Sequence, residues 1–121
     1  MATPVEFISI LHQSHTQAKV FHHQTDSFSV HKAVGEYYEE IVELVDGLVE
    51  STEGIGPRLV GYTTKPLVDY TDVEIVKTYF KGLYDYVQRE RTSVFQTTWQ
   101  QNQIDNIAEL IAETLFQLSL K

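Results

Sequence analysis

The hydrophobic pattern of the first half of the chain has the period of an α-helix. Apolar and small residues step by four, three, four and three positions along a first series, Phe7, Leu11, Ser14, Ala18 and Phe21. A second series with the same stepping comprises Val34, Tyr38, Ile41, Val45 and Leu48. Each series occupies one face of a helix. A turn around Ser27 or Ser29 separates the two series, and the second helix ends near Gly54. The pattern therefore predicts an antiparallel helix pair.

Residues 54–71 interrupt this pattern, because they show no sustained hydrophobic period. They contain three of the 6 glycines and two of the 3 prolines, which predicts a long crossover connection rather than a helix. A third helix is predicted after a capping box of Thr71 and Glu74, with its apolar stripe at Val73, Val76, Phe80, Leu83 and Val87. A fourth is predicted to begin near Thr98, with Gln101 three residues on, and its stripe comprises Ile104, Ile107, Ile111, Leu115 and Leu118.

These elements together predict an all-α fold. Four helices of about 20 residues, each roughly 30 Å long, with one long connection between the second and third, describe a four-helix bundle of the ferritin-like kind. We expect residues 1–121 to form this bundle as a single domain. A chain of this length buries about two thirds of its unfolded surface, which is enough for a core of its own.

Composition and charge remove several classes of function. The 17 acidic and 9 basic residues give a formal charge of −8, which opposes direct DNA binding through phosphate contacts. The chain has no cysteine, so any metal must be held by imidazole, carboxylate or carbonyl groups. Hydrolase and nucleotide-binding motifs are missing. Because there is also no signal sequence and no apolar run long enough for a membrane span, we expect a cytoplasmic protein.

Histidines and carboxylates form the candidate chemistry. A stripe beside the first apolar series contains Ile8, His12, His15, Lys19 and His22, and His31 follows the predicted turn. On the second predicted helix Asp46 and Glu50 are four residues apart, so two carboxylates can approach one cation, and Glu39 and Glu43 extend the acidic stripe. Imidazole and carboxylate together suit iron, manganese or zinc. The alternative is that the histidines are hydrogen-bonded boundary residues and the acids are simply solvated.

The usual di-iron bundle places Glu-x-x-His on two of its helices, so that one subunit supplies every ligand. This chain contains no Glu-x-x-His. If metal binds, ligands shared between subunits are the natural arrangement.

The spacing of His31, Asp46 and Glu50 resembles that of the Dps-like mini-ferritins, in which an aspartate follows a histidine by 15 residues and a glutamate lies four further on. The run VHKAVGEYYEEIVELVDGLVES looks like that family's second helix. The His-x-Gln-Thr turn at residues 22–25 and TLFQL at residues 114–118 are similar to the small ferritin-like proteins of large tailed phages. One departure is that His22 stands nine residues before His31, where the family's spacing of 12 falls on Lys19.

The resemblance implies a homo-oligomer, either a dimer or a dodecameric shell, in the cytoplasm of a bacterium or encoded by a phage. In such a protein His22 and His31 of one subunit would face Asp46 and Glu50 of a twofold-related subunit. That site would oxidise ferrous iron with peroxide or oxygen, which makes a ferroxidase that sequesters iron and protects against oxidative damage. Manganese or zinc could take the place of iron.

The alternative function is a non-catalytic helical interaction module of phage origin that retained the ferritin-like fold and lost the chemistry. Its contact face would be the aromatic third helix, which carries Tyr79, Phe80, Tyr84 and Tyr86. Those rings could equally be core packing.

Overall fold

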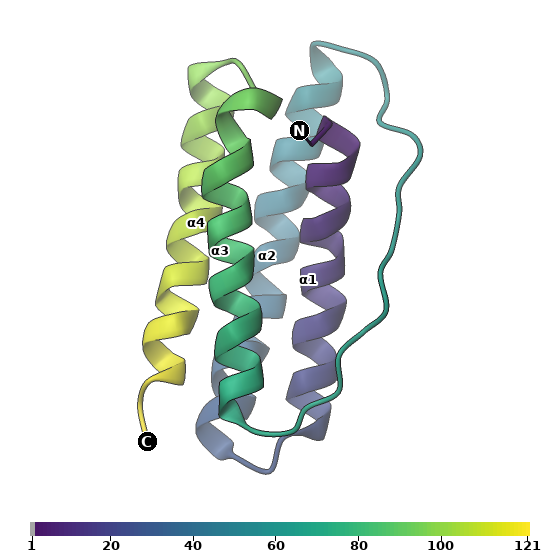
Figure 1. Ribbon diagram of the computed structural model, residues 1–121. Helices are drawn as coiled ribbons and strands as arrows, with labels where there is room; N and C mark the ends of the chain where they lie inside the picture. The colour runs from purple at the N-terminus through teal and green to yellow at the C-terminus, as the bar shows by residue number, and fades with distance from the viewer. Residues whose placement is uncertain (1) are drawn as a thin grey trace.

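A computed structural model describes residues 2–121 and shows four long helices packed side by side (Figure 1). They are α1 (Pro4–Gln24), α2 (Phe28–Gly54), α3 (Val73–Val94) and α4 (Thr98–Leu118). Short turns join α1 to α2 and α3 to α4, whereas residues 55–72 run the full length of the bundle on its outside (Figure 1). The predicted all-α four-helix bundle with a long connection between its second and third helices is confirmed.

The helices begin one residue away from two of the predicted caps. The capping box expected from Thr71 and Glu74 is wrong, because Asp72 caps α3 by accepting a hydrogen bond from the Ile75 amide at 3.1 Å. A carboxylate is at least as good an N-cap as a threonine hydroxyl.

α4 begins at Thr98, as predicted, and the second correction concerns only its cap. The expected pair of Thr98 and Gln101 lies one residue too late, since Thr97 caps the helix and forms a capping box with Gln100. The Gln100 side chain is buried and also donates to Thr52 Oγ1 at 3.0 Å. Because the contact with Thr52 of α2 holds Gln100 in place, the capping box forms from Thr97 and Gln100 rather than from Thr98 and Gln101.

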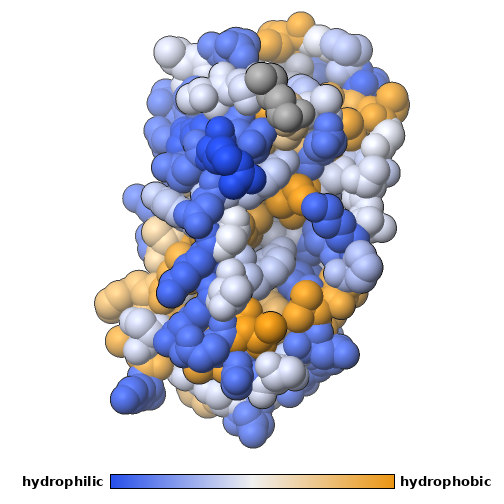
Figure 2. Space-filling view, viewed as in Figure 1, coloured by the Kyte–Doolittle hydropathy of each residue, from blue (hydrophilic) through white to orange (hydrophobic). Residues whose placement is uncertain are grey.

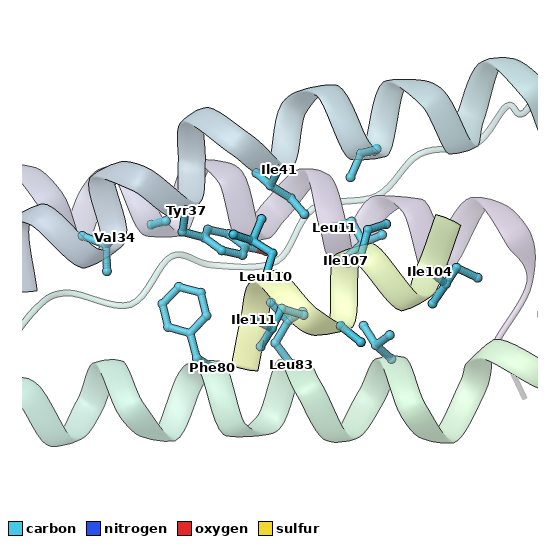
Figure 3. Packing of buried hydrophobic residues seen from close by; sticks show 14 of the residues in the cluster. Leu11, Val34, Tyr37, Ile41, Phe80, Leu83, Ile104, Ile107, Leu110 and Ile111 are labelled. Atoms are coloured by element: carbon cyan, nitrogen blue, oxygen red, sulfur yellow. The ribbon is translucent and has the colours of Figure 1, made fainter. Parts of the chain in front are cut away.

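The core runs along the middle of the bundle and is built from the predicted stripes (Figure 3). One ring differs from the prediction: Tyr37 is fully buried, whereas Tyr38, which the pattern placed in the stripe, is only partly buried. Tyr37 packs edge-on against Phe80 of α3, with ring centroids 4.9 Å apart. The buried face of α2 therefore includes Tyr37 in addition to the predicted stripe, so it is broader than steps of four and three residues along the helix predict.

The long connection, residues 55–72, is here called the strap. It is held to α1 by side-chain amides that bond its main chain. Gln13 donates to the Lys65 carbonyl at 2.8 Å and accepts from the Lys65 amide at 3.2 Å. Gln17 makes the same pair of bonds with Val68, both 2.8 Å long. Because the strap is mostly exposed, these polar contacts rather than apolar packing set its path.

Within residues 2–121, no helix combines the length and apolar content needed to cross a bilayer.

Candidate metal-binding face

His22 and His31 lie together at the turn between α1 and α2. Their rings stack with centroids 3.6 Å apart and planes 20° from parallel. Nδ1 of His22 lies 2.8 Å from the carbonyl oxygen of His31, and Nδ1 of His31 lies 2.9 Å from the carbonyl oxygen of His22. Each imidazole is thus fixed by the main chain of the other helix.

These two contacts determine which ring nitrogen carries the proton. A carbonyl oxygen can only accept a hydrogen bond, so Nδ1 of both rings must donate. In the neutral ring, Nε2 then keeps its lone pair and is free to bind a metal. Metal-binding histidines in proteins commonly have their second nitrogen bonded to a carbonyl in this way. The pair is therefore a hydrogen-bonded seam in which neither Nε2 atom takes part in these two bonds.

Gly35 makes room for this arrangement. A Cβ atom at position 35 would stand 2.9 Å from Cε1 and Nδ1 of His22, closer than van der Waals contact allows. The ring of His22 also meets Tyr38 edge-on at a centroid distance of 5.2 Å. Any larger residue at Gly35 would push the ring away from its carbonyl partner.

The candidate carboxylates lie far from this pair in the same subunit. Along α2, Asp46 is 15 residues and Glu50 is 19 residues from His31, which corresponds to about 22 and 28 Å. Both are exposed, and neither side chain takes part in any of the hydrogen bonds or ion pairs found in residues 2–121. In the same part of the chain, no three histidine, aspartate or glutamate side chains cluster closely enough to hold a metal ion. One subunit alone therefore does not bring the four residues together.

The surface between the two ends is a groove along α1 and α2. A cavity of about 320 Å³ opens there, and its lining is Leu11, His12, His15, Thr16, Ile41, Val42, Val45 and Asp46. His15 meets Tyr38 edge-on at 5.8 Å, and burial, with Lys19 and His12 nearby, lowers the pKa of His15 below its usual value. Exposed Val42 gives the groove an apolar centre. We call the surface from His22 and His31 to Asp46 and Glu50 the α1–α2 face.

One feature of this face escaped the sequence pattern. The Nδ1 protons of His22 and His31 are fixed by hydrogen bonds across the turn between α1 and α2. The sequence signalled this contact only by placing a histidine on each side of that turn.

The aromatic residues of α3 were a candidate contact face, but Phe80 is buried and Tyr79, Tyr84 and Tyr86 pack against the core. These rings stabilise the bundle.

Comparison with known proteins gives one match. No curated protein and no solved structure matches the chain. Residues 22–118 match the model of a family described as a family of unknown function, DUF5856. The matched range begins at His22 and includes His31, Asp46 and Glu50. Because it spans most of the sequence, the chain belongs to the DUF5856 family.

Proposed function

We propose that this protein binds ferrous iron at a site completed by two copies of the chain and oxidises it there with peroxide or oxygen. His22 and His31 of one copy would supply nitrogen ligands, and Asp46 and Glu50 of the other would supply oxygen ligands. Iron is the substrate of this reaction. The observation that carries the proposal is the reciprocal bonding of the two Nδ1 atoms, which leaves both Nε2 atoms as ligands.

A twofold axis across the α1–α2 face satisfies this geometry. In an isologous contact each residue pair occurs twice, related by the axis. For His31 to meet the carboxylates of an antiparallel copy, the axis must cross α2 halfway between residue 31 and residues 46–50, near residues 38–41. The groove with exposed Val42 lies at that level. The same pairing brings the Lys19 ammonium, one turn from the neutral His22, towards the acidic stripe of the partner, which is an opposite-charge contact.

The donor set suits the reaction. Neutral imidazole and anionic carboxylate bind borderline and hard cations such as iron, and also manganese or zinc. Two carboxylates offset the additional positive charge when iron loses an electron. The side chains of Asp46 and Glu50 could bind iron without first breaking a hydrogen bond or ion pair in their own chain.

The connectivity agrees with the proposal. One long crossover between the second and third helices is the connection found in ferritin-like bundles, and the spacing of His31, Asp46 and Glu50 resembles that of the Dps-like mini-ferritins. By this resemblance the protein would sequester iron and protect against peroxide, as a dimer or a dodecameric shell, in a bacterial cytoplasm or as a phage product. Mass measurement in solution distinguishes the two assemblies.

The test is an oxygen-free ferrous titration followed by addition of peroxide, read as the ultraviolet absorbance of ferric iron. His22→Asn with His31→Asn removes the Nε2 ligands but keeps a side-chain donor near the Nδ1 position, so the turn should stay bonded. Asp46→Asn with Glu50→Gln removes the carboxylate charge. Both double variants should abolish tight binding and slow oxidation at least tenfold.

Glu39→Gln with Glu43→Gln is the matched control, because it removes the same charge from the same stripe and leaves the proposed ligands. This control should retain tight binding. If the two ligand variants oxidise iron as fast as the wild type, or if the control loses activity equally, the proposed site is wrong.

The second candidate, a non-catalytic interaction module, is favoured by a different observation. Phe28 and Leu120 are 79% and 52% exposed, and both line a cleft with Lys32 and Lys121 at the end of the bundle where α2 begins and α4 ends. Such a module would fold and associate without responding to iron. An unchanged assembly together with no ferrous binding would favour it.

A further inference from the structure

A second cavity lies on the opposite side of the strap from the α1–α2 face. It has a volume of about 360 Å³, is open to solvent on one side, and is bordered by α1, α3 and the strap. Its lining includes Ile10, Tyr79, Gly82, Leu83, Tyr86 and Val68. In Figure 2 the surface is hollowed between α3 and α1, and apolar residues gather around the hollow. None of its lining residues belongs to the proposed iron site.

The strap forms one rim of this cavity and is fastened to α1 there. Gln13 holds Lys65 and Gln17 holds Val68, each through two hydrogen bonds to the main chain, and Pro66 lies between them on the lining. Val68 is 40% exposed even though it lines the cavity. This rim therefore depends on a few solvent-accessible hydrogen bonds, which can open while the bundle stays folded.

Gly82 leaves one wall of the cavity open. It lies within α3, where a glycine costs helix stability, and its φ is negative, because the positive-φ glycine in residues 2–121 is Gly61. A Cβ atom at Gly82 would meet no atom within 4 Å. Neither backbone conformation nor close packing thus requires glycine here, and its structural effect is to keep this space empty.

The lining determines what kind of molecule fits. Apolar side chains dominate it, and Thr78 and two tyrosines supply hydroxyl groups. Its one charged residue is Lys65, which is exposed, and no carboxylate contributes. Burial raises the pKa of Tyr79, so its phenol stays a neutral donor, and none of the hydrogen bonds found within residues 2–121 uses it. The volume is at the small end of ligand pockets, which begin at about 300 Å³. A neutral molecule with one aromatic ring and an oxygen acceptor matches this size and polarity.

We infer that the cavity between α1, α3 and the strap binds a small uncharged molecule built on one aromatic ring with an oxygen acceptor. The ring would lie among Ile10, Leu83 and Tyr86, with Tyr79 as hydrogen-bond donor. The strap would border the bound molecule on one side.

Acetophenone is a suitable probe, because it has one ring and one carbonyl oxygen and carries no charge. Titration into the full-length protein labelled with ¹⁵N should shift the amide signals of Gln17, Thr78 and Gly82 with a single saturable curve. Gly82→Leu should weaken binding at least tenfold by filling the open wall. Thr78→Phe is a second blocking variant at a different position. Thermal unfolding followed by circular dichroism confirms that each variant is folded.

Gly54→Leu is the matched control, because a Cβ atom at Gly54 also meets nothing within 4 Å and the residue lies at the far end of α2. It should bind acetophenone as the wild type does. Tyr79→Phe should weaken acetophenone severalfold but leave ethylbenzene, which has no acceptor, unchanged. The inference is overturned if acetophenone shows no saturable shifts up to its solubility, or if neither folded blocking variant changes its affinity.

Discussion

Gly35 lies directly against the imidazole of His22, with only 2.9 Å between the position of a Cβ atom at residue 35 and the nearest ring atoms. Gly35→Ala should therefore displace the ring and break its bond to the His31 carbonyl. Loss of one such bond costs about 1 kcal/mol and cancels the gain of about 0.5–1 kcal/mol that alanine brings to a helix interior. Urea unfolding should show Gly35→Ala near neutral in stability.

Gly82→Ala is the control, since the space around Gly82 is open and the full helix gain of about 0.5–1 kcal/mol should appear. Gly35→Ala should also weaken ferrous binding without altering any proposed ligand. Equal stabilisation by the two substitutions would show that His22 is not held as described.

Mixing two inactive variants tests whether the iron site is shared between copies. Subunits carrying His22→Asn with His31→Asn and subunits carrying Asp46→Asn with Glu50→Gln should each be inactive alone. In a mixed twofold dimer one of the two sites recovers all four ligands, so random pairing should restore about a quarter of wild-type oxidation. Stopped-flow absorbance after co-refolding measures this recovery. A site within one subunit would give none.

Ser14 and Tyr37 form a buried hydrogen bond whose direction can be assigned. The Ser14 hydroxyl donates its only proton to the Leu11 carbonyl at 2.7 Å, so the Tyr37 hydroxyl must donate to Ser14 Oγ, also at 2.7 Å. Tyr37→Phe leaves Ser14 bonded and should cost about 1 kcal/mol, whereas Ser14→Ala strands a buried phenol and should cost about 2 kcal/mol. Chemical denaturation of the two variants checks this order, and the reverse order would contradict the assigned direction.

Two buried phenols should make the protein sensitive to alkali. Burial raises the pKa of both Tyr37 and Tyr79 above the ordinary value. The unfolded chain then releases these protons at lower pH than the folded chain, so the stability linked to them is complete below pH about 10 and is lost as the pH rises further. The free energy of unfolding, measured across this range, should fall less steeply in Tyr37→Phe with Tyr79→Phe. An identical slope in that variant would exclude these two groups as the cause.

Amide exchange should show an uneven pattern along the strap. The amides of Thr63, Lys65, Val68 and Tyr70 donate to Ser9, Gln13, Gln17 and Gln24 respectively. The Leu59 and Ile55 amides donate to Glu53 and to the Thr52 carbonyl. The four amides held by α1 should exchange more slowly than the strap amides for which no such partner is found. Gln17→Ala should remove the protection of Val68 and leave the amides of the helical core unchanged. Uniformly fast exchange along the strap would mean that it is not fastened to α1.

The sequence by itself determined the four helices, the place of the long connection and most of the core. A helix repeats every 3.6 residues, so the faces that bear Phe7 and Ile104 can be recognised from neighbouring residues alone. The cap positions were less certain by one residue, because Thr71 and Asp72, like Thr97 and Thr98, are adjacent candidates that local preference does not separate.

Only the tertiary structure decided the contacts between segments. The bond between His22 and the His31 carbonyl, the space beside Gly35 and the fastening of the strap by Gln17 each require two elements at a defined distance and rotation. Hydrophobic periodicity specifies which face of a helix is buried, but not how far that helix slides or turns against its neighbour. The same limit applies to Asp46 and Glu50, whose partners, on the present proposal, belong to another copy of the chain.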